Sequence, residues 1–172
     1  MNNIPIIGFA AYSGTGKTTL IEQIVRNLKS QGYRIAVIKH DAHQFEIDKE
    51  GKDSWRFSHA GADMTILSSR EKTALIEQRE ISFADLVSMV HDVDLILVEG
   101  YKQENIPRIG ISRKAAKKGL PHPSTAYIAV VTDDEAIAAK YDPVFSLDDI
   151  QGISEFIKKV AKIDQISGHF IK

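Results

Sequence analysis

The sequence predicts an α/β fold of the P-loop NTPase type, a three-layer sandwich with a mostly parallel sheet and helices on both faces. Three observations support this class. Short, nearly continuous apolar segments have the pattern of buried parallel strands, and amphipathic helical segments alternate with them along the chain. The first strand also leads into a glycine-containing turn that ends in Lys-Thr. With 172 residues and 43% hydrophobic content, the chain suits a single domain over residues 1–172.

The first elements form one recognisable unit. A strand over residues 4–10 runs into the segment 11–19, which reads Ala-Tyr-Ser-Gly-Thr-Gly-Lys-Thr-Thr. Apolar residues then recur with helical spacing at Leu20, Ile21, Ile24, Val25 and Leu28. A buried strand, a glycine turn and a Lys-Thr pair at a helix start predict a loop that binds the phosphates of a nucleoside triphosphate. An ordinary glycine-rich turn is the alternative.

Each residue type in this loop has a physical role. Gly14 and Gly16 lack a Cβ, so backbone N–H groups can turn inward and approach phosphate oxygens. Lys17 can reach the β and γ phosphates, the Thr18 hydroxyl can ligate Mg²⁺, and Thr19 is placed for the α phosphate. The expected nucleotide contacts are therefore Ser13, Gly14, Thr15, Gly16, Lys17, Thr18 and Thr19. The usual pattern has glycine where this chain has Ala11, a small departure that is harmless if the φ angle there is negative.

The alternation of strands and helices continues after the first helix. The patterns predict strands over residues 34–39, 64–67, 74–76 and 94–100, an edge strand over 109–111, and a buried strand over 126–131. They predict short helices over 53–60 and 134–140, and two further helices that open with capping boxes at residues 82–85 and 146–149.

Two acidic residues close predicted parallel strands at the edge of the sheet where the phosphate loop lies. Glu99 is expected to ligate Mg²⁺ or the attacking water, and Asp41 to hold a Mg²⁺-bound water. His40 is expected to contact phosphate. The alternatives are a polar strand end or a solvated loop, and, for His40 and His43 with Asp41, a zinc site.

Composition limits the other function classes. The formal net charge of −1 gives no general attraction to nucleic acid or to an anionic membrane. The chain has no cysteine, which excludes disulfides and thiolate metal sites. No apolar run approaches the roughly 20 residues of a membrane span, and no signal region is evident at the start. We therefore expect a cytoplasmic protein.

Several segments together resemble the molybdopterin-guanine dinucleotide biosynthesis adapter family, MobB. They are the phosphate loop 11–19, residues 37–43 with Asp48, Gly51–Arg56, Ala60–Ala62 and Leu97–Lys102. The resemblance implies a GTP-binding homodimer with weak GTPase activity that assists the guanylyltransferase joining GMP to molybdenum-bound molybdopterin. Carried over to this sequence, it places Gly14, Gly16, Lys17, Thr18 and Thr19 on the phosphates, and Asp41 and Glu99 near Mg²⁺ and the attacking water.

The sequence allows alternative roles for the residues that could recognise the base and for the basic residues that could bind a partner or a transferred phosphate. Asp133 follows a predicted strand and either accepts the N–H groups of guanine or caps the helix over 134–140. The basic residues Arg108, Arg113, Lys114, Lys117 and Lys118 could attract the phosphate of a pterin cofactor or an acidic face of the transferase, or form a solvated loop. In the alternative function, a P-loop small-molecule kinase or ATP-dependent ligase, they would form a lid over the transferred phosphate.

Overall fold

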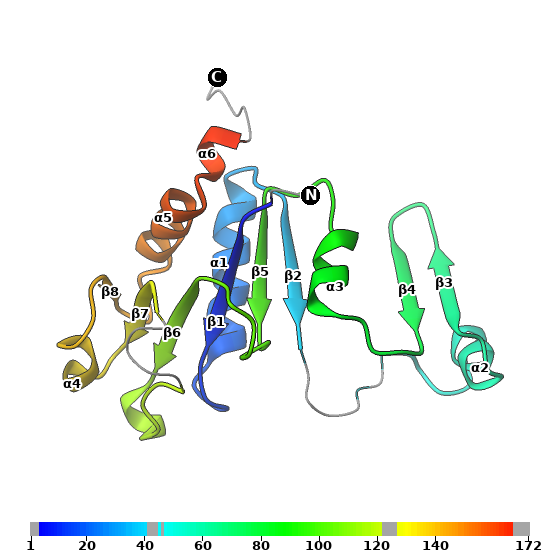
Figure 1. Cartoon of the computed structure of the whole chain (residues 1–172), viewed down its shortest axis with the longest axis horizontal. Helices are drawn as coiled ribbons and strands as arrows, with labels where there is room; N and C mark the ends of the chain where they lie inside the picture. Colours follow the sequence, from blue (N-terminus) through cyan, green and yellow to red (C-terminus); the bar gives the residue numbers. More distant parts are fainter. Residues whose placement is uncertain (1–3, 41–44, 46, 122–126, 167–172) are drawn as a thin grey trace. The chain divides into compact units, whose positions relative to one another are not determined.

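The chain folds into two compact units. The computed structural model describes residues 4–40, 45, 47–121 and 127–166. One unit comprises residues 1–40 and 87–172, and the other comprises residues 41–86 (Figure 1). The single domain over residues 1–172 stays a prediction.

The larger unit is built on a parallel six-stranded sheet in the order β2-β5-β1-β6-β7-β8. Its strands are β1 (Ile6–Ala10), β2 (Ile35–Lys39), β5 (Leu95–Glu99), β6 (Arg108–Ser112), β7 (Ala129–Thr132) and β8 (Val144–Phe145). Its helices are α1 (Lys17–Ser30), α4 (Glu135–Ala138), α5 (Ile150–Ala161), α6 (Ile163–Ile166) and the short 3-10 helix η1 (Lys114–Ala116). The predicted fold class is confirmed.

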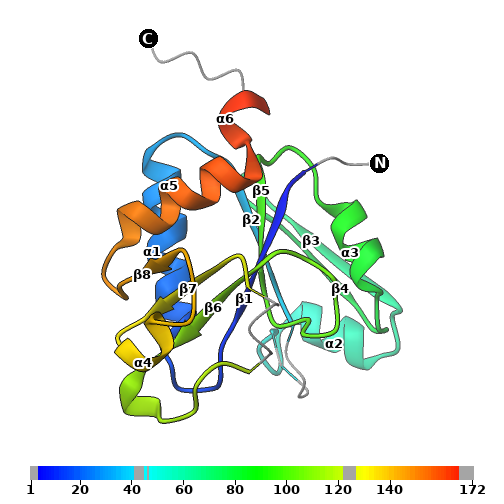
Figure 2. The same ribbon diagram turned by 60° about the vertical axis from the view of Figure 1, so that its left-hand side comes forward.

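Helices α1 and α5 pack against each other over one face of this sheet (Figure 2). Their apolar stripes meet the inward-facing residues of the strands in one cluster. The fully buried members include Ile24, Leu28, Leu95, Leu97, Ile109, Ile111, Ile153 and Ile157. Burying each such side chain contributes about 1.5–3 kcal/mol. This core holds α1 against the face of the sheet that contains β1, and so determines the position of the loop between β1 and α1.

Three sequence predictions about this unit need correction. The strand predicted at the edge over 109–111 lies inside the sheet, because β6 pairs with β1 on one side and β7 on the other. The strand predicted over 126–131 begins at Ala129, and residue 126 lies outside the described part.

The helix expected to be capped at Ser146 begins three residues later. Its N-cap is Asp149, whose carboxylate accepts the Gly152 N–H at 2.9 Å. The chain is still leaving β8 at Ser146, so the helix starts only after a further turn.

The smaller unit contains helix α2 (Asp53–His59) and an antiparallel hairpin of β3 (Met64–Ser68) and β4 (Thr73–Glu77). Helix α3 (Phe83–Met89) crosses the boundary between the units. Its predicted capping box is confirmed, because the Ser82 hydroxyl accepts the Asp85 N–H at 3.1 Å.

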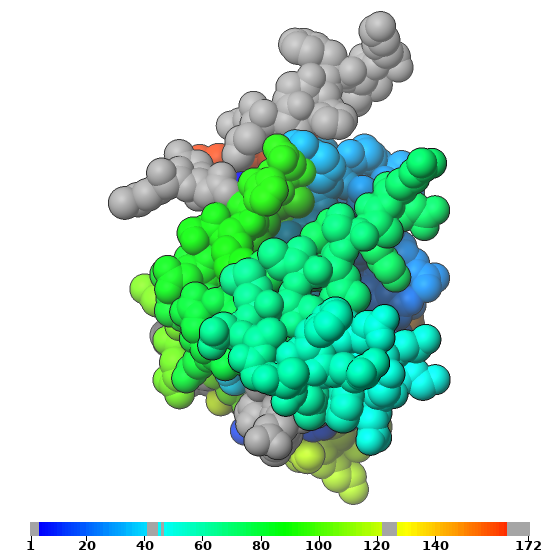
Figure 3. Space-filling model, turned by 90° about the vertical axis from the view of Figure 1, so that its right-hand side faces the viewer, coloured from blue at the N-terminus to red at the C-terminus, as the bar shows by residue number. Residues whose placement is uncertain are grey.

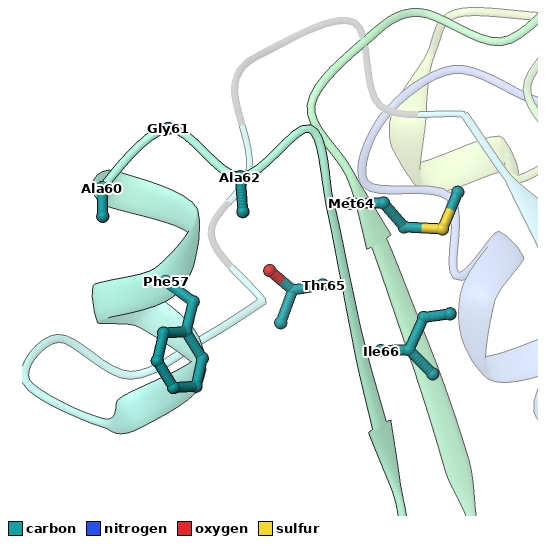
Figure 4. A pocket seen from close by; sticks show the side chains of 7 residues that line it. All are labelled: Phe57, Ala60, Gly61, Ala62, Met64, Thr65 and Ile66. Carbon is teal, nitrogen blue, oxygen red and sulfur yellow. The ribbon is translucent and has the colours of Figure 1, made fainter.

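A depression of about 560 Å³ in the smaller unit is lined by Phe57, Ala60, Gly61, Ala62, Met64, Thr65 and Ile66 (Figure 4). Several large apolar side chains of this unit are exposed, among them Phe57, Ile66 and Leu75; the unit is coloured cyan to green in Figure 3. Among the helices that the structure describes, none has the length and apolar character needed to cross a bilayer.

Candidate functional site

The loop between β1 and α1 is shaped to receive an anion. Gly14 and Gly16 both adopt a φ of +83°, a conformation that L side chains rarely take. Gly16 is the N-cap of α1. In this described stretch, no side chain caps the helix and its first turn holds no acidic residue. The N–H groups at the start of α1, and the positive end of its dipole, are therefore available to a phosphate group.

Glu99 connects this loop to the neighbouring strand. It is the last residue of β5 and pairs in register with Phe9 of β1. Its Oε1 accepts a hydrogen bond from Lys17 Nζ at 3.0 Å, and both carboxylate oxygens lie 3.2 Å from Thr18 Oγ1. The Glu99 side chain is only 9% exposed. The structure thus brings together three predicted site residues from the start of α1 and the end of β5.

The remaining loop residues differ in how far they are exposed to solvent. Thr15 is buried, and its hydroxyl donates to the Tyr12 carbonyl at 2.9 Å, so only its backbone is left for a ligand. Ser13 and Thr19 are exposed. Ala11 does not adopt a positive φ and packs into the core, so the loop forms without the usual glycine there.

His40 lies beside Glu99, at the end of β2. Its backbone N–H donates to the Glu99 carbonyl at 2.9 Å, and its ring meets the edge of Tyr101 with the ring centroids 4.7 Å apart. Asp41 and His43 lie outside the described residues. Within the described part of the chain, no group of three or more His, Cys, Asp or Glu residues could hold a metal ion.

Asp133 is positioned by the segment that follows β6. Its Oδ1 accepts the Lys114 N–H at 2.6 Å. The alternative role as a helix cap is wrong, because α4 is capped by Asp134, which accepts the Ala136 N–H at 3.0 Å. The contact of Asp133 with a guanine base stays a prediction.

The basic residues do not form one surface cluster. Arg108 is buried in β6, where its guanidinium donates to the carbonyl oxygens of Gly100, Tyr101 and Glu104. Burial lowers the pKa of Arg108, so these carbonyl contacts are needed to hold its charge.

Arg113, in contrast, lies against the phosphate loop. Its Nε donates to the Thr15 carbonyl at 3.0 Å, and its Nη2 would lie 3.4 Å from a Cβ at Gly16. The local sequence around Arg113 does not indicate its contact with the loop. The missing signal was the strand order, since a residue after an edge strand would be far from β1.

Comparison with known proteins agrees with this geometry. A family model described as molybdopterin guanine dinucleotide synthesis protein B, MobB, matches residues 6–133. A molybdopterin-guanine dinucleotide biosynthesis adapter protein of Haemophilus influenzae is 42% identical over 137 residues, which cover 77% of this chain and 76% of that protein. The protein of that name from Escherichia coli is 36% identical over 167 residues, 90% of this chain and 91% of its own length.

The fold is also found in a solved structure. The crystal structure of Bacillus subtilis MobB matches with a TM-score of 0.74 at 26% identity, covering 91% of this chain and 97% of that one. The family model matches well over half of the chain, and the relatives match most of it. This chain therefore belongs to the MobB family.

Proposed function

We propose that this protein binds GTP with Mg²⁺ at the phosphate loop, hydrolyses it slowly, and acts as an adapter in molybdopterin guanine dinucleotide biosynthesis, where it assists the guanylyltransferase. The observation that carries the nucleotide part is the set of contacts that joins Lys17 and Thr18 to Glu99 beneath an uncapped helix N-terminus.

The donor set fits a magnesium-bound triphosphate. Thr18 and Glu99 offer the hydroxyl and carboxylate oxygens that Mg²⁺ prefers, and the two side chains lie in contact at 3.2 Å. When bound, Mg²⁺ neutralises phosphate charge and polarises phosphoryl oxygens. Lys17 would exchange part of its contact with Glu99 for the phosphates, while the amides of the loop would donate to phosphate oxygens.

The adapter part of the proposal follows the names of the relatives from Haemophilus influenzae and Escherichia coli. The choice of GTP over ATP and the weak GTPase activity follow from the resemblance. The homodimer and a contact with the molybdopterin cofactor are proposed on the same ground. The cytoplasmic location is proposed because the relatives are named as biosynthetic adapter proteins. Exposed apolar side chains on α2 and the hairpin, such as Phe57 and Ile66, are compatible with a protein partner.

Substitution of Lys17 tests the site. Lys17→Ala should weaken GTP binding by roughly 10- to 100-fold, because it removes charge-assisted hydrogen bonds worth about 1.5–3 kcal/mol. Calorimetric titration with GTP and Mg²⁺ measures the loss, and circular dichroism checks the fold. Lys29→Ala removes an exposed lysine in the last turn of the same helix and is the matched control. Equal GTP affinity in Lys17→Ala and the wild type would refute the site.

Turnover separates the adapter from the kinase or ligase alternative. An adapter should hydrolyse GTP slowly in preference to ATP, with a rate that candidate metabolites leave unchanged and the guanylyltransferase alters. Rapid transfer of phosphate that depends on a small-molecule acceptor would exclude the adapter proposal.

A further inference from the structure

Strand β1, which leads into the phosphate loop, has two neighbours whose ends carry opposite charges. On one side, β5 ends at Glu99, which contacts Lys17 and Thr18. On the other side, β6 is followed by Arg113, which contacts Thr15. If Lys17, Thr18 and Glu99 bind the terminal phosphates with Mg²⁺, as proposed, a nucleotide lying across the loop would have its nucleoside end toward β6 and β7.

Arg113 stands outside the amide-lined interior of the loop. In a loop whose N–H groups converge on an anion, the carbonyl oxygens point outward. Arg113 Nε is bound to one of these carbonyl oxygens, that of Thr15. The guanidinium is therefore placed beside the loop rather than within the space for the phosphates.

The contact with Thr15 and the approach of the guanidinium to Gly16 together restrain the orientation of the guanidinium plane. A planar guanidinium held through Nε keeps its flat face available to a neighbouring ring. The next residue, Lys114, donates its backbone N–H to Asp133 at the end of β7. This bond holds Arg113 and Asp133 in adjacent segments at the same edge of the sheet, which is where the nucleoside end is expected.

We propose that Arg113 is a nucleoside-binding residue whose guanidinium packs on the face of the purine base. The inference rests on the proposed function, since it assumes a nucleotide at the phosphate loop. Guanidinium groups stack on aromatic faces through cation–π attraction, and a guanidinium already held in place loses little freedom on binding. Arg113 thus contributes to affinity for the nucleoside in addition to its Coulombic attraction to the phosphates.

Two ligands distinguish the nucleoside from the phosphates. Inorganic tripolyphosphate and GTP, each with Mg²⁺, are titrated calorimetrically into the full chain. Arg113→Ala should weaken GTP binding by roughly 3- to 30-fold, the range expected for loss of a cation–π contact. It should weaken tripolyphosphate binding less, because that ligand loses only Coulombic attraction. Arg113→Lys keeps the charge but not the plane, and should restore only part of the GTP affinity. Arg26→Ala removes an exposed arginine on α1 that pairs with Glu22, and as the matched control it should change neither affinity.

The outcomes separate this inference from the proposed function. Equal losses for GTP and tripolyphosphate in Arg113→Ala would mean that Arg113 only supports the loop, and unchanged GTP binding would mean that it has no part in binding. Either result overturns the inference while the proposed function stands. A wild-type protein that binds neither ligand would overturn both.

Discussion

At the scale of single residues, Glu99 shows how a buried carboxylate is stabilised by its neighbours. It ends a strand that is buried along its whole length, and it is itself buried. Its carboxylate is stabilised by Lys17 and Thr18, two residues that are predicted to bind the nucleotide. The fold therefore needs the same contacts that the proposed site would use, because an unpaired buried carboxylate would be costly.

Replacement of Glu99 should affect turnover more than binding. Glu99→Gln keeps the shape and removes the charge that is expected beside Mg²⁺ and the attacking water. GTP turnover per bound site should fall about tenfold or more. Affinity should change less, since the loop amides and Lys17 remain. Phosphate release at saturating GTP and a calorimetric titration measure the two quantities. A large loss of GTP affinity with unchanged turnover per bound site would contradict the assignment.

At the scale of elements, the start of α5 is set by a cap and a glycine together. Asp149 accepts the Gly152 N–H, and a Cβ at Gly152 would collide with the Asp149 carboxylate. Glycine in the first turn thus makes room for the capping group. The helix then buries Ile153 and Ile157 against the sheet, so its start also determines which residues enter the core.

Two substitutions test whether α5 is capped by Asp149, as in the structure, or by Ser146, as the sequence pattern predicts. Asp149→Ala should lower the free energy of unfolding by about 1 kcal/mol, the usual contribution of an N-cap side chain. Ser146→Ala should have little effect, since Ser146 is exposed and precedes the helix. Urea denaturation followed by circular dichroism gives both values. A larger loss for Ser146→Ala would restore the capping box at Ser146.

At the scale of the whole molecule, Tyr33, which follows the turn after α1, contacts the last helix that the structure describes, α6. Tyr33 is buried in the core cluster and its hydroxyl donates to the carboxylate of Asp164 in α6. Burial, and then this hydrogen bond, raise the pKa of Tyr33 to about 12. The contact joins segments from opposite ends of the chain, so its loss should affect cooperative unfolding.

The sign of the pH dependence follows from the raised pKa. The folded state holds the Tyr33 proton more tightly than the unfolded state, whose tyrosine pKa is about 10. The stabilisation is complete below pH 10 and is lost as the pH rises toward 12. Tyr33→Phe should therefore show a smaller decrease in the free energy of unfolding between pH 9 and pH 11.5, measured by urea denaturation. Tyr12→Phe, at an exposed tyrosine, is the control. Identical decreases in Tyr33→Phe and the wild type would contradict the assigned role.

The sequence alone determined the features that depend on contiguous residues. The sequence predicts the phosphate loop, the strand before it and the helix after it together. Turn geometry, burial and helical spacing all depend on residues that are close together in the sequence. The fold class and the family resemblance followed from the same local patterns and are confirmed.

Only the tertiary structure decided which distant residues meet. Glu99 lies 82 positions from Lys17 along the chain, and Arg113 lies 98 positions from Thr15. Both contacts depend on the order of the strands. The short β6, with Arg108 and Ser112 at its ends, has the polar pattern of an edge strand. It nevertheless lies inside the sheet, where the carbonyl oxygens of a neighbouring loop accept hydrogen bonds from the buried Arg108. A local sequence pattern predicts how a segment folds and how deeply it is buried. Which strands pair with each other depends on the whole assembled sheet.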